Sequence, residues 1–195
     1  MSSVRPTAKR RLHPIERIDL TVANAAAIDG RTVLARRIGA FAQLGDQPPL
    51  RLLCGVTIGT GLLRRDPKLV RSGLRMLAAH GVATWLKSVI KHRIDRTRPG
   101  EAMNSGRYRL ESGESHARRL SSMPSGHSAG VAAVALAVAR EYPAAAPASG
   151  IAAASIIAAQ LPSKNHFLSD VIAGAAIGIA AEVAVSALMR AARRA

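Results

Sequence analysis

Apolar residues recur at the spacing of a helix along most of this chain, and short polar or basic segments separate the apolar stretches. No stretch of any length shows the alternation of apolar and polar residues that is typical of a strand. The pattern therefore predicts an all-α chain in which about five to six helices form a compact bundle. The expected helical stretches are residues 15–28, 33–44, 50–63, 69–90, 127–139, 148–161 and 168–189.

The polar segments divide the chain into a tail and one domain. Residues 1–14 are polar and basic, so we expect a flexible tail. Residues 15–195 are expected to form a single domain. Residues 91–125 are the one long polar connection, and a loop of that length in a compact domain is usually functional, so we expect an active-site loop. A cleaved signal peptide is not expected, because Asp19 and Asn24 interrupt the first apolar segment.

The length of the apolar stretches bears on membrane insertion. A bilayer span needs about 20 mostly apolar residues, and only 168–189 meets this standard cleanly. Two other stretches reach it with their flanks, so we expect a membrane-embedded bundle; the alternative is a soluble helical bundle with an alanine-rich core. Within 168–189, Gly174 and Gly178 form a G-x-x-x-G pair, which favours close contact between helices.

The basic loops predict an orientation, because such loops tend to remain on the cytoplasmic side of a membrane. Residues 64–75, Arg140 and 190–194 would share that side, and the loops 91–125 and 162–169 would share the other. The sequence thus predicts a multi-pass cell-membrane protein whose active site lies on the non-cytoplasmic side. The loop 91–125 is itself very basic, and a phosphate site there would explain this exception.

The net charge of the chain limits the kinds of molecule that it is expected to bind. Lys and Arg number 28 against 12 Asp and Glu, a formal net charge of +16, which favours anionic partners. Nucleic acid is not expected among them, because aromatic residues make up only 3% and no nucleic-acid-binding motif is present. An anionic membrane surface and phosphate-bearing substrates remain. The single cysteine, Cys54, excludes an intrachain disulfide framework and a multi-cysteine zinc site.

Three short segments carry candidate chemistry. The first places Lys91 and Arg98 with six residues between them, and a proline follows directly. The second is Pro-Ser-Gly-His at 124–127, and the third places His166 four residues before Asp170. If the helices alternate up and down, all three segments lie at the same end of the bundle, which predicts one pocket.

These residue types suit a phosphate ester. Lys and Arg neutralise phosphate oxygens. Ser125 and Gly126 lie where the N–H groups of a helix N-terminus are unpaired, and glycine lets an anion come close. Asp170 is expected to share a helix face with His166 and to hold the tautomer of its ring. His166 and His127 supply a nucleophile and a proton donor. Taken singly, each residue is also explained as a helix cap or a solvated charge, but together they favour one site.

At these residues the chain resembles the type 2 phosphatidic acid phosphatase family, which shares its site with vanadium haloperoxidases. The family pattern is Lys, six residues and Arg-Pro; then Pro-Ser-Gly-His; then Ser-Arg, five residues, His, three residues and Asp. The first two parts match in full, and the third matches at its His and Asp. The family's Ser-Arg falls on Ala159 and Gln160, so a neutral amide replaces one charged phosphate clamp; Lys164 lies nearby as another point charge.

The resemblance implies a metal-independent phosphatase that acts on a lipid phosphate or diphosphate in the bilayer. His166 would attack phosphorus and form a phosphohistidine while Asp170 orients its ring, and His127 would protonate the leaving group and then activate water. The phosphate oxygens would be bound by Lys91, Arg98, Ser125, Gly126 and Gln160.

No cofactor is expected, because the sequence has no carboxylate cluster with metal-ligand spacing. The resemblance offers phosphatidate, phosphatidylglycerophosphate or a polyprenyl diphosphate as substrate, and the sequence does not choose among them. A phosphotransferase is one alternative function. Another is a phosphate-lipid binding protein with weakened catalysis, because Gln160 lacks the charge of the family arginine.

Overall fold

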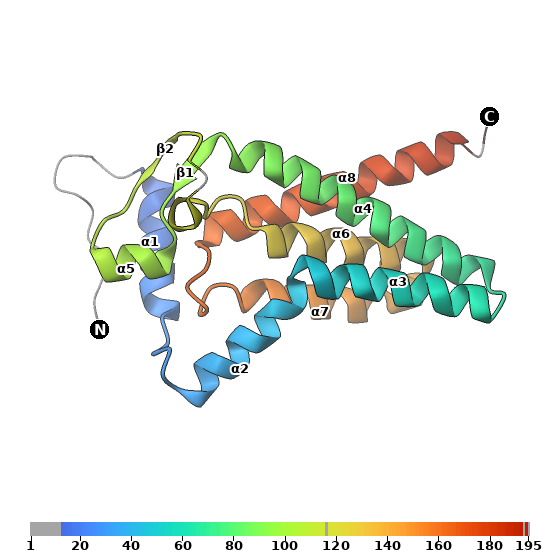
Figure 1. Ribbon diagram of the computed structural model, residues 1–195, viewed down its shortest axis with the longest axis horizontal. Helices are drawn as coiled ribbons and strands as arrows, with labels where there is room; N and C mark the ends of the chain where they lie inside the picture. Colours follow the sequence, from blue (N-terminus) through green and yellow to red (C-terminus); the bar gives the residue numbers. More distant parts are fainter. Residues whose placement is uncertain (1–12, 116, 193, 195) are drawn as a thin grey trace.

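The computed structural model describes residues 13–115, 117–192 and 194, and within them the chain forms eight α-helices and one two-stranded sheet. Five helices pack as a bundle: α3 (Gln47–Leu63), α4 (Pro67–Lys91), α6 (Gly126–Glu141), α7 (Ala146–Ala158) and α8 (Leu168–Ala192). At one end lie α1 (Pro14–Ala26) and α5 (Pro99–Ser105), and α2 (Val33–Ala42) runs from there into the bundle (Figure 1). Each expected helical stretch corresponds to one helix, and the all-α class is confirmed. Of the expected tail, residues 1–12 lie outside the described residues.

The connection 91–125 contains more regular structure than the sequence predicts. It holds α5, a 3₁₀ turn η2 (Arg118–Leu120) and two strands, β1 (Ile94–Arg96) and β2 (Leu110–Ser112). The strands pair antiparallel, with Asp95 opposite Glu111. Strands of three residues are too short to show alternation, and this is why the sequence pattern misses them.

Small residues bring the bundle helices into close contact. The bundle core consists largely of Ala and Val from α4, α6 and α8. A side chain at Gly174 would overlap the carbonyl oxygen of Ser125, and one at Gly178 would overlap that of Ala129. The G-x-x-x-G pair therefore lets α8 lie directly against the first two turns of α6, which carry the Pro-Ser-Gly-His segment.

A second apolar cluster fastens the covering elements to one end of the bundle, here called the site end. It joins α1 and α5 to the loop before α8, where Phe167 is fully buried and meets Tyr108 edge to face at 5.6 Å. The 3₁₀ turn η1 (Gln43–Gly45) connects α2 to α3 at the same end. The remaining members of the cluster are Leu20, Ala23, Ala102 and Met103.

The opposite end of the bundle holds a buried ion-pair network, here called the distal cluster. Arg75 donates to Glu141 and to Glu182, both at 2.9 Å, and also to the hydroxyl of Ser186. Arg71 pairs with Glu141 as well, at 2.9 Å. The network ties the first turns of α4 to the last turns of α6 and α8.

Large apolar side chains cover the outside of the bundle. Leu63 is 88% exposed, Leu52 68% and Trp85 65%. Among the described helices, α8 alone is long and apolar enough to cross a membrane. By the same standard of length and composition, α3 and α7 are short, and the long α4 carries several cationic side chains.

Candidate active site

The two predicted histidines face each other at the site end. His127 is the second residue of α6, and His166 lies two residues before α8. Their ring centroids are 6.0 Å apart, with the planes inclined by 65°. Both helices begin at this end of the bundle (Figure 1). The structure thus brings together two imidazoles from distant parts of the chain, in an edge-to-face arrangement.

The His166 ring is buried and held by the main chain. Its Nδ1 lies 2.7 Å from the carbonyl oxygen of Ser122, so Nδ1 carries the proton and Nε2 is the unprotonated nitrogen. Burial lowers the pKa of His166 well below 6.5, and the positive charges of Arg98 and Lys91 lower it further. At neutral pH the ring is therefore a free base.

Asp170 does not hold this ring directly, contrary to the expectation from the sequence. Its Oδ2 lies 3.9 Å from Nδ1 of His166, whereas the Ser122 hydroxyl donates to Oδ2 at 2.5 Å and the Phe167 N–H donates to it at 2.8 Å. The spacing of four residues brings the two side chains near each other, but the Ser122 carbonyl is better placed as acceptor. Asp170 is linked to His166 through Ser122, whose hydroxyl bonds the carboxylate and whose carbonyl bonds the ring.

Arg96 anchors Asp170, and no motif pointed to it. Its Nη1 donates to Asp170 at 2.5 Å and its Nη2 to Asp19 of α1 at 2.5 Å, while the guanidinium lies 4.4 Å from the centre of the Phe167 ring. Burial opposes the charge, but the two carboxylates outweigh it and raise the pKa of Arg96. The visible signal was a second arginine two residues before Arg98, to which the sequence pattern assigns no role.

His127 also has a partner that the sequence did not assign. Its Nε2 lies 2.7 Å from Oδ1 of Asp46, the residue before α3. Gly45 packs closely against α6, and this contact places Asp46 beside the histidine. The available signal was one carboxylate in a short polar break between two apolar helices.

The predicted phosphate ligands gather around the rings. Ser125 caps α6, since its hydroxyl accepts from the Ser128 N–H at 3.3 Å, and the Gly126 N–H belongs to the first turn, whose donors have no helical acceptor. Lys91 and Arg98 lie close enough to act electrostatically on His166. Lys87, one turn before Lys91 on α4, was missed, although the spacing of four residues was visible; its ammonium lies 3.6 Å from where a Gly126 side chain would start.

Gln160, which the sequence predicts to be a phosphate ligand, forms hydrogen bonds to main-chain carbonyls instead. Its side chain is fully buried, and its Nε2 donates to the carbonyl oxygens of Ala42 at 3.0 Å and Ile156 at 3.4 Å. Both amide protons are therefore used, and the reverse amide orientation would set oxygen against two carbonyls. Gln160 links α7 to α2, and in this arrangement its amide has no free donor for the phosphate that the sequence expectation assigned to it.

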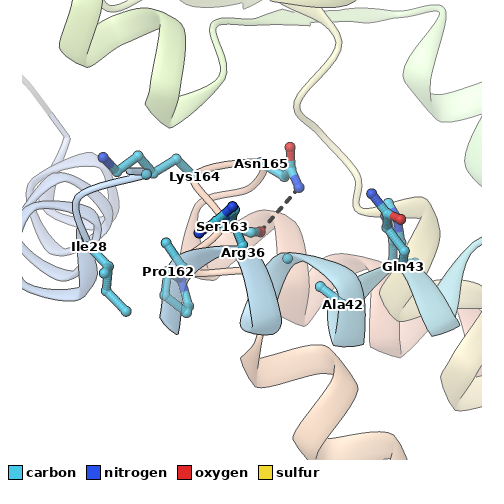
Figure 2. Close-up of a pocket in the computed structure, with 12 residues that line it drawn as sticks. Ile28, Arg36, Ala42, Gln43, Pro162, Ser163, Lys164 and Asn165 are labelled. Atoms are coloured by element: carbon cyan, nitrogen blue, oxygen red, sulfur yellow. Dashed lines mark hydrogen bonds between the residues drawn. The ribbon is translucent and has the colours of Figure 1, made fainter. Parts of the chain in front are cut away.

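A pocket opens beside His127. Its volume is about 290 Å³, and it lies between α2, the segment before α2 and the loop that joins α7 to α8. Figure 2 shows Arg36 on α2, and Ser163, Lys164 and Asn165 on the α7–α8 loop. The pocket adjoins the histidine pair on the side of His127, because His166 is not among its lining residues.

The described residues contain no group of three or more His, Cys, Asp or Glu side chains placed to share a metal ion. The chemistry that the site can supply from its own residues is nucleophilic and acid–base catalysis with cationic stabilisation of an anion.

Comparison with known proteins locates the chain among characterised folds. A model of the PAP2 superfamily matches residues 72–194. The crystal structure of a transmembrane PAP2-type phosphatidylglycerolphosphate phosphatase from Bacillus subtilis is similar, with a TM-score of 0.68 and 23% identity over 92% of this chain and 88% of that one. LpxE from Aquifex aeolicus has a TM-score of 0.64 and 20% identity over 86% of this chain and 93% of that one. No curated protein sequence matches the chain.

Proposed function

The chain belongs to the PAP2 superfamily, and from this membership and the facing histidines we propose that it is a lipid phosphatase. It removes the terminal phosphoryl group of a lipid phosphate or diphosphate without a metal ion. The observation that carries the proposal is the pair of imidazoles 6.0 Å apart, one of them a buried free base. The structural relatives include a phosphatidylglycerolphosphate phosphatase, which is consistent with a lipid substrate.

In the first step, Nε2 of His166 attacks phosphorus. The Ser122 carbonyl holds the proton on Nδ1 and so keeps the lone pair on Nε2. The N–P bond forms as the bond from phosphorus to the leaving oxygen breaks, and the electron pair of that bond stays on the oxygen. The product is a phosphohistidine.

His127 supplies the proton that the leaving oxygen takes. Asp46 occupies Nε2 of this ring, which leaves Nδ1 for proton transfer. Burial and the charges of Arg98 and Lys91 lower the pKa of His127 below 6.5, and the Asp46 carboxylate opposes this shift by stabilising the protonated ring. In the second step the neutral His127 accepts a proton from water, the oxygen of that water attacks phosphorus, and the N–P bond breaks. Inorganic phosphate leaves, and both histidines return to their starting state.

The cationic residues stabilise charge on the transferred group. Lys91 and Arg98 pair with the phosphoryl oxygens, and the Ser125 hydroxyl and the Gly126 N–H donate to them. These donors are held before substrate arrives, because the α6 cap and the α6–α8 contact fix the segment 124–127. A fixed set of donors costs little reorganisation as charge develops.

We further propose that the bundle is embedded in a membrane. Exposed Leu and Trp side chains on the outside, together with ion pairs on the inside, are the reverse of the pattern in a soluble protein. The distal end carries Arg71, Arg140 and Arg190, so this end would face the cytoplasm and the site end would face the other side. The lipid tail of the substrate then lies in the bilayer while its phosphate reaches the histidines.

A second candidate is a protein that binds phosphate lipids with little turnover. The neutral Gln160 at the position of the family arginine favours it, since one cationic ligand is missing from the site.

One assay separates these functions. The full chain, purified in detergent with a chelator present, is given phosphatidate, phosphatidylglycerophosphate and a polyprenyl diphosphate, and release of inorganic phosphate is measured. We expect steady release that falls by about 10³-fold or more in His166→Ala and in His127→Ala. The variant His13→Ala, at an exposed histidine outside the three motif segments, serves as control. Absence of turnover on every lipid, a need for added divalent metal, or full activity of His166→Ala would overturn the proposal.

A further inference from the structure

The proposed chemistry determines which part of the substrate lies in the pocket beside His127. His127 gives its proton to the leaving oxygen, so whatever is bonded to that oxygen must lie on the His127 side of the phosphoryl group. The pocket is on this side, since His127 lines it and His166 does not. This step rests on the proposed function: the pocket is where the leaving group lies when the P–O bond breaks.

The walls of this pocket are cationic. Arg36 reaches it from α2 and Lys164 from the α7–α8 loop (Figure 2). None of the lining residues is acidic, and neither cation forms an ion pair with a carboxylate in the described part of the chain. Asp46, beside the histidine pair, is engaged by His127. Asp29, between the lining residues Ile28 and Gly30, accepts from the N–H of Arg31 at 3.0 Å.

Hydrogen bonds fix the backbone around Lys164, so its side chain starts from a defined position beside the pocket. Its carbonyl accepts from the Gly100 N–H at 3.0 Å, and its own N–H donates to Leu161 at 3.1 Å. Ser163 and Asn165, on either side of it, are joined by a hydrogen bond of 3.1 Å. The loop thus presents one cation and two polar side chains to a space whose volume, about 290 Å³, suits a small polar group.

We propose that Arg36 and Lys164 bind a second phosphate group carried by the leaving group, so that they determine substrate specificity. A neutral leaving group such as diacylglycerol would leave both cations without a partner. A leaving group that bears its own phosphate, either the inner phosphate of a diphosphate or the phosphodiester of a phosphatidylglycerophosphate, pairs with them. The preferred substrate therefore has two phosphates, and the outer one is transferred to His166.

The test compares substrates that differ by one phosphate. The value of kcat/KM is measured with the full chain in detergent for a polyprenyl monophosphate and diphosphate of the same chain length, and for phosphatidate and phosphatidylglycerophosphate. We expect the wild type to prefer the two-phosphate member of each pair. The double variant R36Q/K164Q should lose about tenfold of that preference. Unequal losses on the two pairs would identify which source of second phosphate the pocket fits.

A matched control removes the same charge from the same part of the chain. Arg31 lies five residues before Arg36 and Arg37 directly follows it, and neither lines the pocket, so R31Q/R37Q should keep the wild-type preference. The inference is overturned if the wild type shows no preference, or if both double variants change it equally, although phosphate release from a monophosphate would still support the phosphatase. If no lipid phosphate is hydrolysed, the proposed function and the inference fail together.

Discussion

Two buried arginines, Arg96 at the site end and Arg75 in the distal cluster, resemble each other in burial and in their pairing with two carboxylates. Arg96 is 1% exposed and bridges Asp19 and Asp170, while Arg75 is 9% exposed and bridges Glu141 and Glu182. Each fastens three elements and donates to a hydroxyl as well. Burial and pairing alone would therefore assign both the same structural role.

The difference lies in what each network reaches. From Arg96, hydrogen bonds lead through Asp170 to Ser122, whose carbonyl holds the ring of His166. From Arg75 they end at Ser186 and the carboxylates of α6 and α8, at the opposite end of the bundle. We therefore expect a substitution to affect turnover more strongly when fewer hydrogen bonds separate the substituted residue from the two imidazoles.

The largest effect is expected at Asp46, which touches His127 directly. Asp46→Asn keeps the shape but removes the charge that stabilises the protonated ring, so kcat should fall by about 100-fold. Asp66→Asn is the matched control, because Asp66 precedes α4 at the distal end as Asp46 precedes α3 at the site end. Steady-state kinetics would measure both. Equal kcat values in the two variants would remove Asp46 from the account.

The next largest effect on kcat is expected at Arg96 and not at Arg75. Lysine keeps the charge but loses the fork that bridges two carboxylates, so Arg96→Lys and Arg75→Lys should each lose about 2 kcal/mol of stability. Only Arg96→Lys should also lower kcat, by about tenfold, with KM little changed, because Asp170 and Ser122 lose their anchor. Thermal unfolding and kinetics on the same samples test this. A fall of kcat in proportion to stability in both variants would contradict the positioning role.

A smaller effect concerns pH. The pKa of His166 lies well below 6.5 because the ring is buried and faces Arg98 and Lys91, so the acidic limb of kcat/KM due to this ring should lie below pH 6.5. The unfolded ring binds a proton near pH 6.5 and the folded ring does not. The contribution of His166 to the free energy of unfolding is therefore fully present above pH 6.5, and it is lost as the pH falls toward the pKa of the folded state. Glu182→Gln, in the distal cluster, should keep the wild-type pH profile of kcat/KM. His166→Gln should weaken the dependence of stability on pH.

The smallest effect is expected at Gln160, which lies at the site end without a hydrogen bond to the catalytic groups. Gln160→Met should lower stability by about 1–2 kcal/mol, because the Ala42 and Ile156 carbonyls lose a donor, and should change kcat by less than about threefold. Phosphate release and a melting curve measure the two quantities. A kcat lower by about 100-fold would restore Gln160 as a phosphate ligand.

The sequence predicted the parts of the site that lie within single helices. The positions of the seven apolar helices followed from their spacing, and their up-and-down alternation placed the segments of His127 and His166 at one end. Ser125 and Gly126 followed from a helix start. The G-x-x-x-G pair correctly predicted close helix contact, and α8 uses it against α6.

Contacts between distant segments could not be predicted in the same way. The acceptor for His166 is a carbonyl of Ser122, and backbone atoms carry no sequence signal. Asp46 meets His127 only because Gly45 packs on α6, and Arg96 meets Asp19 only because α1 covers the site end. Gln160 occupies the family arginine position by count, but a count does not say that its amide turns toward Ala42.

The identity of the phosphorylated residue tests the central claim most directly. His127→Ala is mixed with a phosphate ester whose leaving group needs no proton, such as p-nitrophenyl phosphate, so that the intermediate forms but water is not activated. The sample is quenched in alkali, in which phosphohistidine survives, and the phosphorylated peptide is located by mass spectrometry. The account predicts phosphate on His166 in His127→Ala and none in His127→Ala/His166→Ala. Phosphate on any other residue, or an adduct that persists in the double variant, would contradict it.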